Sequence, residues 1–437
     1  MKKTLKRIAL ILVATPFVLA ALAAIVYFTY ALLAVGGEST QHQAYLKKHM
    51  QEVGIGANKF EIFDDAFYNS KVIMLGEVHG FAMPQQLDFE LLKHLNQKTG
   101  LTHYLAEVDQ SQAYFLNQYL ATGDEKLLDY VYQTWVGMNL QWANRDSYNK
   151  MKKIYAYNQT LTAAKRITIV GVDRIHDTDV TKRHLAELLQ TANYKPGSDA
   201  IVDSLNQLLT DSTTENETLR SFASNNLTAD FNLPQTLKTD LQHIFTNLNY
   251  QHESIARDSV MFLNLKDLSY ANDWQNEQFY GMWGLMHTLQ NKVNGGYTSF
   301  AAHLKNNESP FKNKVTTINI MATDSENMIP AGMMPKSINK GQAYVNTTWV
   351  NSDGPMVFVN GIKDLKAVTK VNSMAIFKLD AENSPYKSSS LLANTSVLMP
   401  GQGGVKSDTE NPTITEVCQY VVLIRNSKAA TPIKALL

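Results

Sequence analysis

The sequence predicts an α/β fold with a mixed, largely parallel central sheet flanked by helices, a helical insertion and an N-terminal transmembrane helix. Three observations lead to this prediction. Short apolar runs, several closed by glycine, an acid or a histidine, alternate with stretches of helical periodicity, as in sheets whose parallel strands are joined by helices. From about 192 to 250 the composition shifts toward Asn, Thr, Ser and Asp with scattered leucines. An uncharged, mostly apolar run extends from Ile8 to about Val35.

The amino-terminal run is long enough to span a membrane. A bilayer needs about 20 apolar residues, whereas the apolar core of a secretory signal is usually about 7 to 15 residues long. We therefore predict that residues 1–40 are a membrane anchor or signal-anchor segment. The basic residues from Lys2 to Arg7 should stay in the cytoplasm, which places the remaining chain on the periplasmic or extracytoplasmic side. Cleavage after small residues near Ala21 or Ala24 is the alternative.

Residues 41–437 form the folded body in this prediction, and the polar segment 36–41 is a flexible joint. The chain has 437 residues, of which 44% are hydrophobic, which is enough to fill a sizeable core. Lysine plus arginine equals aspartate plus glutamate at 40 each, without a basic stripe beyond the first residues, so no nucleic-acid partner is expected. The single cysteine, Cys418, lies in an apolar run and is expected to be a buried, inert thiol.

The elements of the body follow from its apolar periodicity. Helices are expected at 45–53, after His79, at 113–157, within the insertion at about 192–250, at 252–268 and from about His287 onward. Strands, which are short and β-branched or aromatic-rich, are expected at 71–75, 102–106, 166–170, 278–283, 315–321, 356–359, 374–379 and 420–424. The insertion is either a lid over the site or a surface excursion.

Two stretches share one pattern, Gly76-Glu77-Val78-His79 and Gly284-Leu285-Met286-His287, and each directly follows an expected strand. Two further strand ends carry acids, Glu107 and Asp173. In open α/β sheets, ligands bind outside the carboxyl ends of the strands, where the connecting loops converge on a crevice. The four strand ends are therefore expected to meet in one pocket, provided that the strands are parallel neighbours.

The residue types in this pocket point to acid/base chemistry. Glu77 and His79 occupy alternate positions, so their side chains point to the same side, and the carboxylate could orient an imidazole that removes a proton from water. A structural histidine satisfied by its neighbour is the alternative. Arg257 could hold a carboxylate or a developing oxyanion. Candidates for substrate binding at the rim are Asp173, Arg174 and Gln86.

The sequence argues against a serine nucleophile and against phosphate or dinucleotide binding, but it leaves a metal site open. No Gly-x-Ser-x-Gly elbow, phosphate loop or Gly-x-Gly-x-x-Gly fingerprint occurs in the chain. His79, Glu107 and His287 together form the ligand set of a two-histidine, one-carboxylate metal site, although nothing in the spacing assigns a metal. Activation of water by acid/base groups, a metal site and pure binding all stay open at this point.

This ordered set of motifs resembles the superfamily that joins erythromycin esterases, Tiki and TraB proteins, and ChaN-type haem-uptake lipoproteins. The resemblance covers most of the chain from Val72 to about Leu289. It rests on Leu75-Gly76-Glu77-Val78-His79-Gly80, Ala106-Glu107, Gly171-Val172-Asp173, Arg257-Asp258 and Gly284-Leu285-Met286-His287.

The resemblance implies that His79 is a general base, that Glu77 and Glu107 shape its charge, that His287 completes the pocket and that Arg257 matches the family arginine. In the esterase branch a macrolactone is hydrolysed without a required metal, in the Tiki branch a peptide is cleaved with a divalent metal, and in the ChaN branch the scaffold binds haem. The spacing of Glu77 and His79 is one residue shorter than is common in the esterases, and the second motif lacks the His-Asn-x-His form. By these two details the chain is nearer the Tiki and ChaN branches, whereas its insertion and carboxy-terminal strands are more similar to the esterases.

The expected protein is a membrane-anchored hydrolase that acts on an ester-type small molecule with no required cofactor. The substrate would lie between the strand ends and the inserted helices. The alternatives are a metal-dependent protease with a peptide substrate, and a non-enzymatic module that binds haem.

Overall fold

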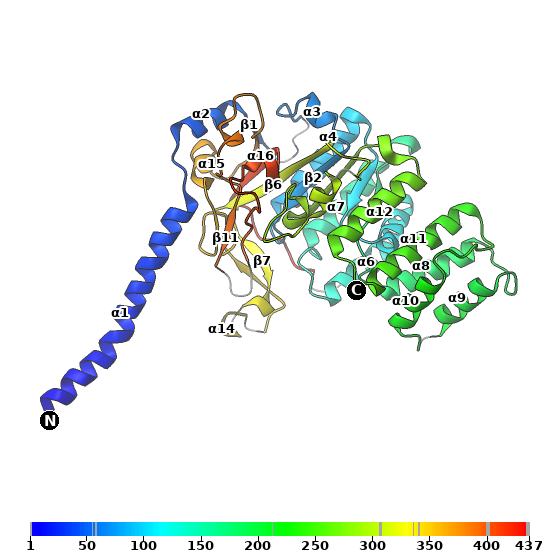
Figure 1. Cartoon of the computed structure of the whole chain (residues 1–437), viewed down its shortest axis with the longest axis horizontal. Helices are drawn as coiled ribbons and strands as arrows, with labels where there is room; N and C mark the ends of the chain where they lie inside the picture. Colours follow the sequence, from blue (N-terminus) through cyan, green and yellow to red (C-terminus); the bar gives the residue numbers. More distant parts are fainter. Residues whose placement is uncertain are drawn as a thin grey trace.

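The computed structural model describes residues 2–54, 56, 59–211, 213–305, 308–334, 336–339, 341–398 and 403–433. Within these residues the central sheet has eight strands in the order β1-β10-β12-β6-β2-β5-β3-β4 (Figure 1). The six strands from β12 to β4 are parallel to one another, and β10 pairs antiparallel with β12 and with β1. The expectation of a mixed, largely parallel sheet is confirmed. The strands of the sheet are β1 (Met50–Val53), β2 (Val72–Glu77), β3 (His103–Ala106), β4 (Thr168–Gly171), β5 (Phe279–Gly284), β6 (Val315–Thr323), β10 (Met374–Lys378) and β12 (Tyr420–Arg425).

Helices cover both faces of the sheet, which is why its inner strands are buried along their whole length. Alternate residues of β2 show the two layers: Ile73 and Leu75 pack in one hydrophobic cluster with α4 to α7, and Val72 and Met74 pack in another with α12 and α13. The helices of these layers are α4 (Met83–Thr99), α5 (Gln110–Thr122), α6 (Glu125–Gly137), α7 (Arg145–Asn158), α12 (Arg257–Ala271) and α13 (Phe300–Leu304). Shorter helices are α3 (Asp65–Tyr68), α14 (Lys336–Asn339), α15 (Ile362–Val368) and α16 (Ile414–Val417).

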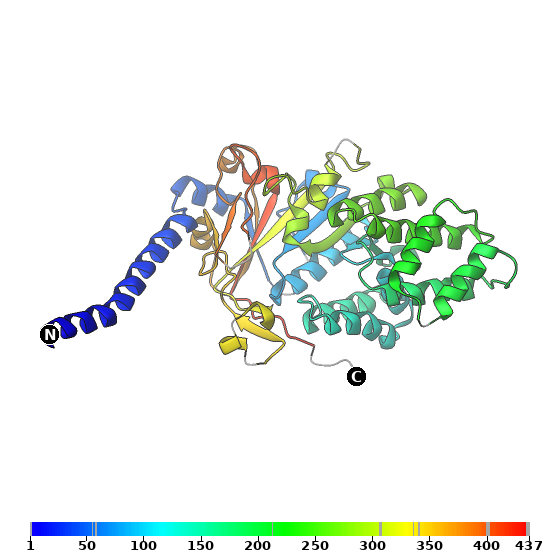
Figure 2. The same cartoon turned by 60° about the horizontal axis from the view of Figure 1, so that its bottom comes forward.

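The helical insertion expected at about 192–250 lies at one end of the molecule (Figure 2). It comprises α9 (Ala200–Thr210), α10 (Asn216–Asn225) and α11 (Gln235–His252), which pack with α8 (Thr178–Thr191) around a hydrophobic cluster of their own. One hydrogen bond between the insertion and the end of β4 is made by the Asn247 side chain, which donates to the backbone carbonyl of Asp173 over 2.9 Å. The insertion is therefore a separate small core attached beside the strand ends.

Three expected elements differ from the structure. The helix expected at 45–53 is α2 (Thr40–Lys48), and its last residues instead form the edge strand β1. The strand expected at 356–359 is β9 (Val357–Val359), which pairs with β11 (Thr395–Val397) outside the central sheet; a second small sheet joins β7 (Asn327–Pro330) to β8 (Tyr344–Thr347). The helix expected from His287 is only the 3₁₀ turn η3 (Leu285–Thr288), because the apolar residues that follow pack in an extended loop.

The amino-terminal helix α1 (Lys2–Val35) projects from the body (Figure 1). Its segment Thr15–Val35 has a mean hydropathy of 2.4 and is long and apolar enough to cross a membrane, a test that a signal sequence also passes. Its carboxyl end contacts the body, where the Tyr27 hydroxyl donates to the carbonyl of Pro355 over 3.0 Å.

The segment between α1 and α2 is clamped rather than flexible as expected. One oxygen of the Asp364 carboxylate accepts hydrogen bonds from the backbone N–H groups of Glu38 and Ser39, over 2.8 and 2.9 Å, and from the Gln43 side chain. Ser39 in turn caps the first turn of α2. A single buried carboxylate on α15 thus holds the joint against the body.

Candidate active site

The residues of the candidate site lie at the carboxyl ends of four neighbouring strands. β2, β5, β3 and β4 are parallel and adjacent, so their carboxyl ends lie at one edge of the sheet. β2 ends at Glu77, Glu107 follows β3, Asp173 follows β4, and His287 lies in the turn after β5. The four segments meet at this edge: Glu107 contacts His287 directly, Arg257 joins Glu107 to Asp173, and Glu77 lines one cavity together with Glu107 and His287.

The first pair is Glu77 and His79. Glu77 is buried, and one of its oxygens lies 2.9 Å from Nδ1 of His79 and 3.5 Å from the side-chain amide of Gln85. Burial alone favours the neutral imidazole, but the hydrogen bond and charge of Glu77 outweigh burial and raise the pKa of His79. An ionised carboxylate can only accept, so the neutral ring carries its proton on Nδ1 and leaves Nε2 free to take a proton.

The second histidine is held as a cation. Nδ1 of His287 lies 2.7 Å from the Asp258 carboxylate, and Nε2 lies 3.4 Å from Glu107. Burial alone would lower the pKa of His287, but hydrogen bonds to these two carboxylates raise it to about 10. Asp258 is itself fixed by the Tyr297 hydroxyl and by the backbone N–H of Phe300. This shift of the pKa favours the imidazolium form of His287 at neutral pH.

Arg257, at the start of α12, connects the remaining two strand ends. Its guanidinium donates to both oxygens of Asp173, at 2.5 to 3.2 Å, and to Glu107 over 2.8 Å. Burial opposes ionisation of Glu107, yet His287 and Arg257 hold the pKa of its carboxyl well below its usual range. The second oxygen of Glu107 accepts from the backbone N–H of Gly284 over 2.8 Å. Glu107 is thus an ionised carboxylate with both oxygens engaged.

A space the size of one small group lies between these residues at Gly284. A Cβ built on this glycine would lie 3.2 Å from Nε2 of His79, 3.5 Å from Cδ2 of His287 and 3.6 Å from Oε2 of Glu107. The backbone of Gly284 has φ −54°, a value that any residue adopts, so the glycine is not needed for its conformation. What its missing side chain provides is room beside the free nitrogen of His79.

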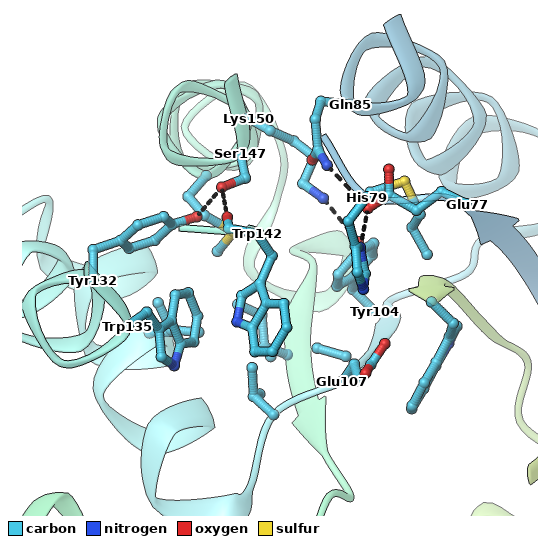
Figure 3. Close-up of a pocket in the computed structure, with 17 residues that line it drawn as sticks. Glu77, His79, Gln85, Tyr104, Glu107, Tyr132, Trp135, Trp142, Ser147 and Lys150 are labelled. Atoms are coloured by element: carbon cyan, nitrogen blue, oxygen red, sulfur yellow. Dashed lines mark hydrogen bonds and ion pairs between the residues drawn. The ribbon is translucent and has the colours of Figure 1, made fainter. Parts of the chain in front are cut away.

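Two cavities adjoin this space. The smaller, of about 100 Å³, is lined by Glu77, His79 and Gln85 on one side and by Trp135 and Trp142 on the other (Figure 3). The ring of Trp142 lies 5.4 Å from that of His79, centroid to centroid. The larger cavity, of about 430 Å³, reaches from His79, Arg257 and His287 toward β9 and β11. Among the described residues, none from 192–250 lines either cavity, so the carboxy-terminal segments rather than the inserted helices face the strand ends.

Comparison with known proteins identifies solved structures of similar fold. No protein-family model and no curated protein sequence matches the chain. Among solved structures, a Bacillus cereus protein superposes with a TM-score of 0.62 at 12% identity, covering 90% of this chain and 99% of that chain. A succinoglycan biosynthesis protein gives a TM-score of 0.62 at 15% identity, covering 91% and 100% of the two chains. A mutant erythromycin esterase in its open conformation gives 0.56 at 13% identity, covering 86% and 95%.

The chain has the erythromycin esterase fold. At these identities the likeness concerns the fold alone, and it confirms the fold that the sequence motifs implied. The superpositions cover at least 95% of each of these three neighbours and at least 86% of this chain.

The structure brings most of the expected site residues together on this fold. Glu77, His79, Glu107, Arg257 and His287 all line the larger cavity. Three expected substrate-binding residues do not line either cavity. Asp173 is fully buried and is paired with Arg257, and neither Arg174 nor Gln86 is among the lining residues. The neighbour of Gln86, Gln85, lies 3.5 Å from Glu77 instead.

Sequence reasoning missed several residues that complete the site. Gln85 shares the first turn of α4 with Gln86, and only the phase of the helix start at Met83 decides which of the two faces inward. Asp258 follows Arg257 directly, and its role was hidden because adjacent helix positions point in different directions. The sequence indicates only that Gly284 ends a strand. It does not show that a side chain at this position would contact His79, His287 and Glu107.

The side chains proposed as metal ligands do not form a vacant ligand set. Within the described residues no group of three or more His, Cys, Asp or Glu side chains is arranged to hold a metal ion. Of the three candidates, Glu107 has both oxygens engaged by Arg257 and Gly284, and His287 has both ring nitrogens beside carboxylates. The donor set does not fit a metal in this arrangement. That no cofactor is required stays a prediction.

The charge on His287 predicts a loss of stability in alkali. Its folded pKa of about 10 lies above the unfolded value near 6.5, so its contribution to the free energy of unfolding is fully present below about pH 6.5 and is lost as pH rises toward 10. We expect the unfolding midpoint of the His287→Gln variant to fall less than that of the wild-type chain between pH 7 and 10. Thermal unfolding across this range is the measurement. The His252→Gln variant, in which an exposed histidine is replaced, should show the same pH dependence of the unfolding midpoint as the wild type. Equal pH dependence in all three proteins would contradict the raised pKa of His287.

Proposed function

We propose that the protein is a hydrolase in which His79 activates a water molecule for attack on an ester. The observation that carries the proposal is the position of Nε2 of His79. This nitrogen is left free by the Glu77 hydrogen bond and lies beside Gly284 at the wall of the larger cavity, which has room for a water molecule. The hydrogen bond and charge of Glu77 raise the pKa of the imidazole above its ordinary value, which makes the ring a stronger base.

The proposed reaction proceeds in two steps. Nε2 of His79 takes a proton from the water while the water oxygen bonds to the ester carbonyl carbon, which forms a tetrahedral oxyanion. The carbon–oxygen bond to the alcohol then breaks, and His79 returns the proton to the leaving alkoxide, so that an acid and an alcohol are released. Glu77 holds the ring in the required tautomer and stabilises the imidazolium that forms between the steps.

We expect Arg257 to stabilise the oxyanion as a donor and His287, whose ring nitrogens both face carboxylates, to stabilise it by its charge alone. Arg257 and His287 line the larger cavity, whereas the carboxylates that hold them from behind, Asp173 and Asp258, do not. Removing one donor to an oxyanion typically lowers kcat by about 100- to 1,000-fold. Glu107 lies between the two cations and keeps them together against their mutual repulsion.

The test of this function uses the full chain purified in detergent. Hydrolysis of para-nitrophenyl acetate is followed with and without a chelator, peptide cleavage is followed in parallel, and the visible absorbance is recorded. We expect ester hydrolysis that survives the chelator. Activity that is lost with the chelator, together with peptide cleavage, would establish the metal-dependent protease instead, and a Soret band without hydrolysis would establish a haem-binding module.

We further propose that α1 anchors this hydrolase in a membrane, with residues 41–437 on the periplasmic or extracytoplasmic side. The support is the apolar length of α1 and the basic residues that precede it. The expressed protein is expected to sediment with membranes and to resist extraction by carbonate, with its amino terminus intact. Recovery of a soluble form that begins beyond Ala24 would show that the segment is a cleaved signal.

A further inference from the structure

The larger cavity has two chemically different ends. Among the described residues that line it, the charged or titratable ones are Glu77, His79, Glu107, Arg257 and His287, all of which belong to the candidate site. The far end is lined by aliphatic side chains of the carboxy-terminal segments, including Val357, Val359, Val397, Val405, Ile414 and Val417. A ligand that fills the cavity therefore needs a polar group at the histidines and an apolar body beyond it.

The wall at the apolar end is the short strand β9. Successive side chains of a strand point to opposite sides, so Val357 and Val359 face the cavity while Phe358 faces away from it. The Phe358 ring lies 6.4 Å from the ring of Tyr27 and 5.6 Å from that of Tyr30, both on α1. One strand thus separates the cavity from the amino-terminal helix.

The helix and the cavity also share one hydrophobic cluster. Val35 is buried in this cluster, and Tyr27, Ala31 and Ala34 pack against it. The same cluster contains cavity-lining residues from five parts of the chain, namely Leu289, Met321, Val359, Leu392, Ile414 and Val417. Apolar contact is continuous from the surface of α1 to the interior of the cavity.

The contact with α1 lies at the level expected for the membrane surface. The uncharged run from Ile8 to Val35 is longer than the roughly 20 residues that the hydrocarbon needs, so a span that begins at Ile8 ends next to Tyr27. Tyrosines are enriched where a spanning helix leaves the hydrocarbon. Leu398, which directly follows β11, is 41% exposed, and its N–H donates to the carbonyl of Met356 just before β9. With α1 inserted in a membrane in this way, the apolar end of the cavity would lie next to the bilayer surface.

We propose that the substrate is an amphiphilic ester taken from the membrane, with its apolar chain lying against β9 and β11 and its ester group at His79. This inference rests on the proposed hydrolase function and names its substrate class. The cavity volume of about 430 Å³ lies within the range of about 300–1,000 Å³ that is usual for small-molecule sites. A chain of methylene groups suits the aliphatic walls, because it needs no hydrogen-bond partner there.

The first experiment measures the dependence on chain length. The full chain is reconstituted in vesicles of phosphatidylcholine and phosphatidylglycerol and is supplied with para-nitrophenyl acetate, butyrate, octanoate and laurate. Burial of one methylene is equivalent to roughly a threefold to fourfold gain in affinity. We expect kcat/KM to rise by about threefold per added methylene until the cavity is filled. A kcat/KM that is equal for acetate and laurate would overturn the inference.

Two variants are designed to narrow the apolar end of the larger cavity. Val357 and Val397 are partners in the β9–β11 pairing, line the cavity and are only partly buried, so a larger side chain can be added at either position. Val357→Phe and Val397→Phe are each expected to lower the ratio of laurate to acetate kcat/KM by about tenfold. The matched control is Val371→Phe, because Val371 is 63% exposed outside the cavity and its ratio should equal that of the wild type. An unchanged ratio in both cavity variants would overturn the inference.

A second measurement identifies the source of the substrate. A phosphatidylcholine with a fluorescent acyl chain is placed either in the vesicles that contain the protein or in separate vesicles. Release of the fluorescent acid should be faster, by about tenfold or more, when lipid and protein share a bilayer. Equal rates, or hydrolysis of soluble esters alone, would show that the cavity takes free apolar molecules from solution.

The outcomes separate this inference from the hydrolase function. Hydrolysis of acetate with no preference for longer chains would leave the proposed function standing and remove the membrane substrate. Absence of hydrolysis for every ester, in vesicles and in detergent, would remove the hydrolase function itself. A preference for long chains that the two cavity variants abolish would support both.

Discussion

Replacement of His79 by alanine is expected to lower kcat for ester hydrolysis by about 100- to 10,000-fold while the fold is retained. The imidazole is the only group beside the space at Gly284 that combines a free ring nitrogen with a pKa raised from near neutrality, among the residues that the structure describes. His79 is partly exposed at the cavity wall, so its removal leaves no buried partner except Glu77. The measurement is kcat on para-nitrophenyl acetate, together with circular dichroism of the same preparation.

The control for this variant is a histidine that makes a similar contact elsewhere. His252 lies on α11, is exposed, and pairs with Glu217 over 2.8 Å, so His252→Ala removes an imidazole–carboxylate pair at the surface. Its kcat should be that of the wild type. If His79→Ala kept more than about a tenth of the wild-type kcat, His79 would not be the general base.

Replacement of Gly284 by alanine is expected to lower kcat by about 100-fold or more without removing any functional group. The added methyl group would lie 3.2 Å from Nε2 of His79 and would crowd the side of the ring from which we expect the attacking water to approach. The backbone angles of Gly284 are ordinary for alanine, and its N–H can still donate to Glu107. The free energy of unfolding should therefore change by less than about 1 kcal/mol. Steady-state kinetics and urea unfolding of the same samples test both statements.

A matched glycine variant separates the filled space from the change of residue. A Cβ at Gly137, at the end of α6, would meet no atom within 4 Å, so Gly137→Ala should retain both activity and stability. If Gly284→Ala were as active as Gly137→Ala, the water would have to lie elsewhere, and the attack geometry proposed for His79 would be wrong.

The parts of the fold that could be predicted from the sequence are those in which local pattern and tertiary packing agree. β2 and β5 were expected within about two residues of their observed bounds, because both are apolar runs stopped by a functional turn. The site could be predicted for a related reason: the carboxyl ends of parallel strands lie at the same edge of a sheet, so Glu77 and Glu107 share that edge although β5 lies between their strands.

The rest depends on contacts between distant segments. Residues 285–293 have apolar spacing that resembles a helix, yet Met286 and Leu289 face the cavity because the carboxy-terminal strands pack over them. The sequence of β9 predicts a strand but does not indicate which strand it pairs with. Its pairing with β11 is what makes it a wall of the larger cavity. The position of the insertion could be predicted, but whether it faced the strand ends could not, because that depends on how α11 docks onto the backbone near Asp173.

The clamp made by Asp364 on the joint after α1 has a consequence for how the protein encounters its substrate. A domain on a loose tether sweeps a volume of solution, whereas a domain fixed to its anchor keeps one face toward the bilayer and moves only as the anchor diffuses. With Glu38 and Ser39 held by one carboxylate, the cavity would travel along the membrane in a constant orientation wherever α1 is inserted. Its search would then be two-dimensional, and the surface density of the substrate, rather than its concentration in solution, would set the rate of encounter.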